Sequence, residues 1–241
     1  LSYLRLGGEA EQNWLDSWQA TLSYQTGQDS NFRDRSNSGR AVTHQALDLE
    51  TWGLDFQMES KLGPGSLVYG FDYYHDEVSS SATTNGAFDP ALRPVADDSS
   101  YDLLGLFAQY KWRPLERFEI SGGLRYSRAN AKWERNNVEI LPGVNQDLPG
   151  DGSWDDLSFS LRGLVDVTEE LSLFGGVSQA FRAPNLNDLT GQTFSLNGLS
   201  SSGSVELDPE KFWLTELGVR WEGESLFASF SGYYTIMDGQ I

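Results

Sequence analysis

LGLFAQYKWRPLERFEISGGLRY, residues 104–126, is the stretch that decides the fold of this chain. Every second residue is apolar or glycine from 104 to 112 and again from 118 to 126, and Pro114 lies in the short link between the two rows. Side chains alternate between the two faces of a β-strand, so this spacing predicts two strands that each have one apolar face. The tight link predicts that the two strands run antiparallel.

The same alternation recurs along most of the chain. Each further row is interleaved with small or polar residues, and the whole pattern predicts about nine strands near the length of a tilted membrane strand, roughly 9 to 11 residues. The further apolar rows span residues 18–24, 52–58, 67–73, 157–165, 171–177, 213–221 and 226–234.

Short and long links alternate between these rows. Outer-membrane barrels have short periplasmic turns and longer extracellular loops, whereas a soluble sandwich usually keeps both ends compact. The sequence therefore predicts an all-β fold, a fragment of an antiparallel transmembrane β-barrel, with the short turns facing the periplasm. The short turns lie at 63–65, 114–117, 168–170 and 222–224, and the long links cover 27–43, 76–100, 130–155 and 181–211.

Aromatic residues near the ends of the apolar rows support a membrane-facing surface. Tyr110 and Trp112 lie beside the turn at Pro114, and Trp221 lies beside the turn at Gly223. Amphipathic rings favour the boundary between headgroups and acyl chains. The opposite face mixes both signs of charge, which predicts a wet lumen where neighbouring charges pair across strands. The polar residues predicted to face the lumen are Lys111, Arg125, Arg162, Glu216 and Arg220.

Composition excludes several classes of function. The net charge of −18 argues against a nucleic-acid partner, because phosphate recognition needs clustered Lys and Arg. The chain has no apolar run of about 18 residues, so no transmembrane helix is expected. Cysteine is absent, which excludes disulfides and thiolate metal sites. Hydrolase, metalloprotease and phosphate-binding motifs are also absent, so we expect no enzyme activity, catalytic residue, metal site or cofactor.

Several motifs resemble those of one family of barrels. Residues 177–189, VSQAFRAPNLNDL, resemble the segment F-R-A-P-x-L-x-D-L with which TonB-dependent receptors leave a barrel strand. Further on, LDPE at 207–210 and LTELGVR at 214–220 resemble the family's L-x-P-E and E-L-G-x-R motifs. Other similar stretches are 105–110 (G-x-F-A-Q), 122–126 (G-G-x-R-Y) and 232–241, which resembles a strand ending in D-x-I. The first hundred residues match by pattern only.

The resemblance implies a receptor in the outer membrane of a Gram-negative-type bacterium that imports a scarce large solute on energy relayed through TonB. Such barrels have about 22 strands and a plugged lumen. We therefore expect residues 1–241 to form part of a single barrel domain, with the N-terminal plug and the C-terminal strands absent from this sequence. The implied partners are the TonB complex, outer-membrane lipid and lipopolysaccharide, and a small-molecule ligand such as a metal chelate. An iron siderophore is the leading candidate ligand, with cobalamin and haem as alternatives.

The loop that follows the F-R-A-P motif is the candidate ligand site. Proline keeps the preceding Ala183 out of helical geometry, which favours an extended exit from the sheet. A structural corner is therefore an alternative to direct contact with ligand. Haem receptors of the family carry a histidine and N-P-N-L after F-R-A-P, whereas this chain has no histidine after Phe181, which puts haem in doubt. The candidate ligand-binding residues are Phe181, Arg182, Asn185, Asn187 and Asp188.

Two histidines and an acidic stretch are further candidates for binding a metal ion or haem. His44 and His75 lie where a strand is expected to meet a long loop, so each is either a metal or haem ligand or a solvated loop residue. The carboxylates near the third long link lack the D-x-D-x-D-G spacing of a calcium loop, which favours solvated loop charge. These carboxylates are Asp147, Asp151, Asp155 and Asp156.

Two other classes of protein remain open from the sequence. A passive porin or adhesin-type barrel would share the strand pattern but need no energy coupling, and a porin would fold a constricting loop into its lumen. A soluble β-sandwich that binds carbohydrate would use the same aromatic residues as stacking surfaces or core. Recovery of the protein in buffer without detergent would favour the sandwich.

Overall fold

A computed structural model describes residues 1–12, 14–34, 36–38, 41–141, 144–194 and 200–239. The last two residues of the stretch that resembles the D-x-I strand, Gln240 and Ile241, lie outside these ranges. Among the described residues, no helix has both the length and the apolar character needed to cross a membrane.

Within these ranges the chain forms one 11-stranded sheet and a separate two-stranded hairpin. The long strands follow one another in chain order and each pairs antiparallel with the next, which confirms the all-β antiparallel fold. The strands of the sheet are β1 (Ser2–Gln12), β2 (Leu15–Arg33), β3 (Thr43–Leu62), β4 (Gly65–Thr84), β5 (Ala87–Phe88), β6 (Asp97–Leu115), β7 (Phe118–Leu141), β8 (Val144–Asp166), β9 (Leu171–Arg182), β12 (Glu210–Glu222) and β13 (Phe227–Asp238).

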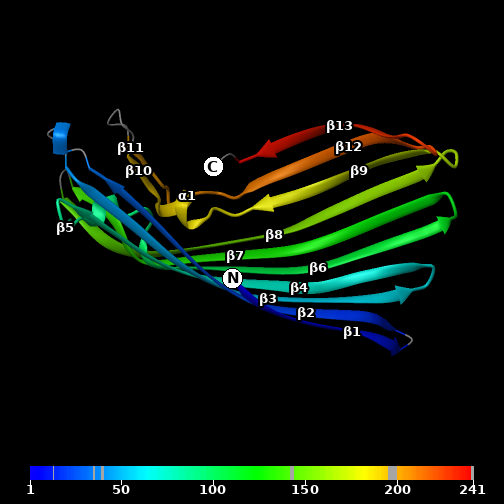
Figure 1. The fold of residues 1–241 in the computed structure, drawn as a ribbon, viewed down its shortest axis with the longest axis horizontal. Coiled ribbons are helices and arrows are strands. Elements are labelled where there is room, and N and C mark those ends of the chain that lie inside the picture. Colours follow the sequence, from blue (N-terminus) through cyan, green and yellow to red (C-terminus); the bar gives the residue numbers. More distant parts are fainter. Residues whose placement is uncertain (13, 35, 39–40, 142–143, 195–199, 240–241) are drawn as a thin grey trace.

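Short elements gather at one end of the sheet (Figure 1). The tight turns lie at the opposite end, where β3 joins β4, β6 joins β7, β8 joins β9 and β12 joins β13. The short elements are the hairpin β10 (Gln192–Phe194) and β11 (Ser200–Ser202), the 3-10 helices η1 (Ser36–Ser38) and η2 (Pro90–Leu92), and the helix α1 (Leu186–Thr190).

Strand register keeps the apolar rows together on one face. Met58 pairs with Tyr69, which pairs with Ala108 and through it with Leu124. Large apolar side chains of this outward face are exposed, Leu106 and Leu217 among them. The opposite, inner face carries the predicted lumen residues, because Lys111, Arg162 and Glu216 follow one row of partners through Ser121 and Gly176. Arg125 and Arg220 lie at even offsets from that row and therefore on the same face.

The strand count and the long links differ from the sequence prediction. The sheet has 11 strands rather than about nine, because β1 and the two-residue β5 were not predicted. In β1 only Leu4 and Leu6 are bulky in the apolar row before Gly8 and Ala10, so the alternation is too short to recognise.

Strands extend into three of the four predicted long links. Residues 130–155 belong almost entirely to β7 and β8, β4 runs to Thr84, and β2 runs to Arg33. The outward row turns polar near the headgroup boundary while the backbone pairing continues beyond it. A prediction from apolar periodicity therefore ends each strand too early, because backbone hydrogen bonds continue whatever the polarity of the side chains.

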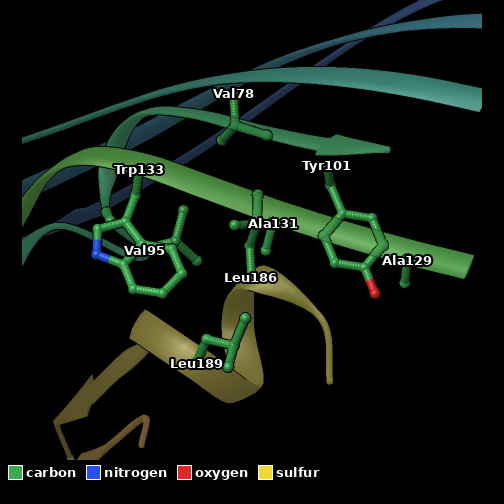
Figure 2. Close-up of a cluster of buried hydrophobic side chains, with 9 residues drawn as sticks. Val78, Val95, Tyr101, Ala129, Ala131, Trp133, Leu186 and Leu189 are labelled. Atoms are coloured by element: carbon green, nitrogen blue, oxygen red, sulfur yellow. The ribbon is translucent and has the colours of Figure 1, made fainter. Parts of the chain in front are cut away.

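The buried core lies at the end opposite the tight turns. It forms on the inner face, where Val78, Tyr101, Ala129, Ala131 and Trp133 of β4, β6 and β7 contact Leu186 and Leu189 of α1. Figure 2 shows the two leucines pointing from α1 toward the strand that carries the two alanines. Val95 and Ala96 complete this mouth core. Away from it, the inner face carries charged side chains together with apolar ones such as Phe174 and Leu214, and the outward face is exposed.

Candidate functional site

The segment that follows β9 is built around a self-contained helix cap. Asn185 is the N-cap of α1, and its side chain accepts a hydrogen bond from the backbone N–H of Asp188 at 2.9 Å. The Asp188 carboxylate accepts in return from the backbone N–H of Asn185 at 3.0 Å. This reciprocal pair is a capping box, which satisfies two N–H groups that the helix start would otherwise leave unpaired.

Arg182 joins this cap to the start of the next barrel strand. Its guanidinium lies 2.6 Å from the Asp188 carboxylate and 3.1 Å from the Glu210 carboxylate. Glu210 is buried and opens β12, directly opposite Arg182 in register. Arg182, at the end of β9, therefore connects the cap of α1 to the start of β12.

The apolar side of α1 is buried against the inner wall. Leu189 is 1% exposed, and the two alanines below it, Ala129 and Ala131, are fully buried. Their small side chains allow α1 to lie close to β7. Such burial stabilises the segment by about 1.5–3 kcal/mol for a leucine.

Buried hydrogen bonds hold the same contact. The hydroxyl of Tyr101 donates to the carbonyl of Pro184 at 2.9 Å, and burial raises the pKa of Tyr101 to about 12. The Thr190 hydroxyl accepts from the backbone N–H of Ala96 at 3.0 Å and donates to the carbonyl of Leu186 at 2.8 Å. Each polar group that α1 brings into this core therefore has a partner.

The rest of the mouth is tied down by further long-range contacts. Trp154 donates from its indole N–H to the carbonyl of Leu207 at 3.0 Å. Arg93 is buried and pairs with Asp147 at 3.2 Å. Lys211 pairs with Asp156 at 2.6 Å. The prediction that Asp147 and Asp156 are solvated loop charges is therefore wrong: both lie on β8, and each carboxylate pairs with a cation.

The five candidate ligand residues do not converge on one site. Arg182, Asn185 and Asp188 interact with one another, and Phe181 lies on the outward row of β9 in register with Lys211. Asn185 and Asn187 are exposed at the mouth. Ligand contact by these residues stays a prediction, and the geometry makes the F-R-A-P motif a structural corner.

The histidines lie on strands rather than in loops. His75 is on the outward row of β4, with its Nδ1 2.8 Å from the Asp102 carboxylate and its Nε2 3.4 Å from Glu77. The Asp102 carboxylate also accepts a hydrogen bond from the Tyr73 hydroxyl at 2.5 Å. His44 lies near the start of β3, where its ring approaches Phe32. In the described part of the chain, no three His, Asp or Glu side chains are grouped to hold a metal ion.

The charges of the inner face form specific pairs. Arg125 makes two parallel hydrogen bonds of 2.8 Å to the Asp72 carboxylate, reaching from β7 to β4 across the intervening β6. The strand between them carries Gly105, and a Cβ atom there would lie 1.9 Å from the Arg125 guanidinium. The pair exists because this position of β6 has no side chain. Sequence alternation predicts the face on which Arg125 lies. It does not predict the partner Asp72, which lies two strands away.

Nearer the tight turns, the inner face is hollowed. Lys111 and Arg113 both pair with Glu119, at 3.0 and 2.7 Å. Glu119 also lines a cavity of about 570 Å³ on this face. The polar lining of this cavity includes Ser121 and three of the predicted lumen residues. Those three residues are Arg162, Glu216 and Arg220. A lipid-exposed surface and a polar, hollowed inner wall are the two faces of a transmembrane barrel.

A family comparison decides between the remaining readings of this barrel wall. The family model described as "TonB dependent receptor-like, beta-barrel" matches residues 2–241. The chain belongs to this family. Its match covers the first hundred residues, which the sequence motifs had left unassigned, so the TonB-dependent receptor barrel extends across the whole described sheet.

Individual relatives of this TonB-dependent receptor barrel agree with the assignment. The ferric aerobactin receptor of Klebsiella pneumoniae is 22% identical over 237 residues, covering 83% of this chain and 32% of that protein. The chain thus spans about a third of the length of this curated relative.

Solved structures share the fold. The copper transporter OprC superposes with a TM-score of 0.80 at 19% identity, over 98% of this chain and 38% of that one. The Serratia marcescens hemophore receptor HasR, in complex with its hemophore HasA and heme, gives the same TM-score and identity and is covered to 39%. The ferric enterobactin receptor PfeA of Pseudomonas aeruginosa gives 0.70 at 17% identity, over 99% of this chain and 34% of that one. These structures show the shared fold, and the family model over residues 2–241 is what places the chain outside the soluble sandwiches and the passive porins.

Proposed function

We propose that the complete protein imports a ferric siderophore across the outer membrane of a Gram-negative-type bacterium, using energy delivered by TonB. The observation that carries this proposal is the family match over residues 2–241. Two of the relatives bear the names of ferric siderophore receptors, for aerobactin and for enterobactin. Other relatives are named for copper and for heme, so these ligands are the competing outcomes.

The chain favours a siderophore over heme. Its histidines are His44 and His75, both before the F-R-A-P motif. His75 lies on the outward row of β4, away from the inner face that would line a transport path. An iron chelate carries its own metal ligands and needs no protein histidine.

The segment that follows β9 also suits a receptor mouth. The mouth core holds the segment 183–194 against the inner face, so this loop narrows the external opening while leaving the exposed Asn185 and Asn187 near the path of an incoming solute. Porins share such an inward-folded loop, and the feature alone does not distinguish them. The plug that would block leakage, with its TonB box, is expected in the complete protein outside these residues.

The experiment is iron uptake in a strain that has only this receptor. Cells are given radioactive iron as a complex with aerobactin, with enterobactin or with heme, or are given radioactive copper, before and after collapse of the proton-motive force or deletion of TonB. We expect uptake of one siderophore complex that stops in both de-energised arms. Uptake that survives in them would support a passive barrel, and uptake restricted to heme or copper would overturn the siderophore assignment. Catalytic turnover of the ligand is not expected, since the relatives are receptors and transporters.

A further inference from the structure

A histidine lies between two carboxylates on the outward face, past the apolar part of β4. Tyr73 is the last residue of the apolar row of this strand, and His75 and Glu77 follow it on the same face. In register, His75 lies between Trp52 of β3 and Asp102 of β6. The ring therefore lies where the outward face changes from apolar to polar, on the side of the apolar surface away from the tight turns.

Both nitrogens of this ring face a carboxylate. Nδ1 of His75 lies 2.8 Å from the Asp102 carboxylate, and Nε2 lies 3.4 Å from the Glu77 carboxylate. A neutral imidazole carries one N–H, whereas an imidazolium carries two, so only the protonated ring donates to both carboxylates. The contact with Asp102 is the stronger one. The side chains of His75 and Asp102 are 29% and 26% exposed, whereas that of Glu77 is 69% exposed and its charge is screened by water.

Asp102 is held by β4 at two points. The Tyr73 hydroxyl donates at 2.5 Å to the same carboxylate oxygen that faces His75. The hydrogen bond to Asp102 raises the pKa of His75 above its ordinary value of 6.5, although burial opposes this shift. Burial acts to raise the pKa of Asp102, but the hydrogen bonds from Tyr73 and His75 lower it below its ordinary value of 3.8. We call Tyr73, His75 and Asp102 the β4–β6 brace.

The strands beside β4 add carboxylates, and the cations lie farther away. Glu50 of β3 is in register with Glu77 and adds to the negative potential around the ring. Lys132 lies on β7, beyond β6, where it favours the charged form of Asp102. The titratable and charged groups on the elements around the ring are Tyr24 of β2, Glu50 of β3, Tyr73 and Glu77 of β4, Asp102 of β6, and Arg128 and Lys132 of β7.

The brace borders the mouth core. Tyr101, next to Asp102 on β6, and Val78, shortly after His75 on β4, are both buried in that core. Past the brace, the backbone pairing of β4 with β6 continues only as far as Val78 and Ser99. The brace is therefore a side-chain connection between two strands at the place where their backbone pairing is about to end.

We propose that the β4–β6 brace is pH-sensitive: the protonated ring of His75 joins β4 to β6 beside the mouth core, and loss of its proton releases this connection. Because the pKa of His75 is raised, its contribution to stability is complete below about pH 6.5 and is lost as the pH rises through the folded-state pKa. Because the pKa of Asp102 is lowered, its contribution is complete above about pH 3.8 and is lost as the pH falls through the folded-state pKa. The brace is therefore complete in a mildly acidic medium. This property needs no ligand and goes beyond the proposed function.

The test is amide hydrogen exchange of the complete receptor in mild detergent at mildly acidic and mildly alkaline pH, corrected for the intrinsic exchange rate at each pH. Protection of residues 75–80 and 99–103 is expected to decrease roughly threefold to tenfold at the higher pH, since one pKa unit is a factor of ten and both groups are partly exposed. His75→Gln keeps a hydrogen-bonding side chain without a charge, and it should show no such decrease. His44→Gln is the matched control, because His44 lies near the start of β3 with its ring close to Phe32, and it should keep the decrease.

A second measurement follows the proton on His75 itself. Diethyl pyrocarbonate modifies the neutral ring, so the modified fraction of the His75 peptide, measured by mass spectrometry against pH, gives the midpoint of its titration. Asp102→Asn is expected to move this midpoint to lower pH. Equal protection at the two pH values in wild type, the same decrease in His75→Gln, or an unchanged midpoint in Asp102→Asn would each overturn the inference. Resistance to SDS without heating confirms that the barrel of each variant is folded.

Discussion

At the scale of single residues, one ion pair of the inner face depends on the absence of a side chain at Gly105. Arg125 could be assigned to the lumen from alternation alone, because period two fixes the face of every strand residue. Its partner Asp72 could not, since the pair spans β6 and requires the register of three strands and a glycine between them. A glycine in a strand has several explanations, and only the contacts show that Gly105 makes room for a guanidinium.

Gly105→Ala should therefore break the Arg125–Asp72 pair. The added Cβ would meet the guanidinium at 1.9 Å and the Asp72 carboxylate at 2.7 Å. We expect the free energy of unfolding to fall by roughly 1–3 kcal/mol, measured by urea denaturation of the complete barrel in detergent. Gly163→Ala is the matched control, because a Cβ there meets nothing within 4 Å. Equal effects of the two substitutions would contradict this role for Gly105.

Tyr101 makes the stability of the mouth core decrease at high pH. Its pKa is raised by burial from 10.0 to about 12, so the protonated phenol is favoured in the folded state. The stability that this group contributes is complete below about pH 10 and is lost as the pH rises through about 12. We expect protection of the 183–194 segment from proteolysis to decrease over that window in wild type. A Tyr101→Phe variant, which cannot ionise, should show no such decrease; the same decrease in that variant would exclude Tyr101 as its cause.

At the scale of elements, the strands are longer than the segments that are predicted to cross the membrane. The sequence predicted where each strand crosses lipid, because that is where its outward row is apolar. It did not predict that β7 and β8 remain paired far beyond that boundary, because the outward row becomes polar there and the apolar residues Ala129, Ala131 and Trp133 lie on the inner face instead. The contact between α1 and β7 was also beyond prediction, since it joins Leu189 to alanines about 60 positions earlier that carry no distinctive pattern.

Leu189→Ala should release α1 from the inner wall. The side chain is 1% exposed, and its truncation is expected to destabilise the segment by roughly 2–4 kcal/mol. Amide hydrogen exchange across residues 186–194 should accelerate while exchange in β6 and β7 stays slow. Unchanged exchange in the helix would show that the mouth core does not hold it.

Asn187→Ala tests the ligand site without disturbing that core. Asn187 is exposed, and its side chain has no part in the capping box. We expect α1 to keep its protection from exchange and the Kd for the transported siderophore to increase about threefold to tenfold, the loss of one or two hydrogen bonds. An unchanged Kd in a receptor with normal uptake would remove Asn187 from the ligand site.

At the scale of the whole molecule, we assign each face and each end of the sheet to an environment. We expect the outward row around Leu124 to face lipid, the tight turns to face the periplasm, and α1 to lie at the cell surface. Family membership is shown by the family model over residues 2–241, whereas the two sides of the membrane are inferred from the tight turns at one end of the sheet and the longer connections at the other. These assignments can be tested cleanly, because residues 1–241 contain no cysteine and single cysteines can be placed at will.

The decisive measurement is labelling of single cysteines in the complete receptor by a membrane-impermeant maleimide. Asn187→Cys should react in intact cells, Glu169→Cys in the turn between β8 and β9 should react only after the outer membrane is permeabilised, and Leu124→Cys should resist the reagent in both conditions. We expect this pattern of labelling for a barrel wall with these two faces and these two ends. Rapid labelling of Leu124→Cys, or labelling of Glu169→Cys from outside intact cells, would contradict it.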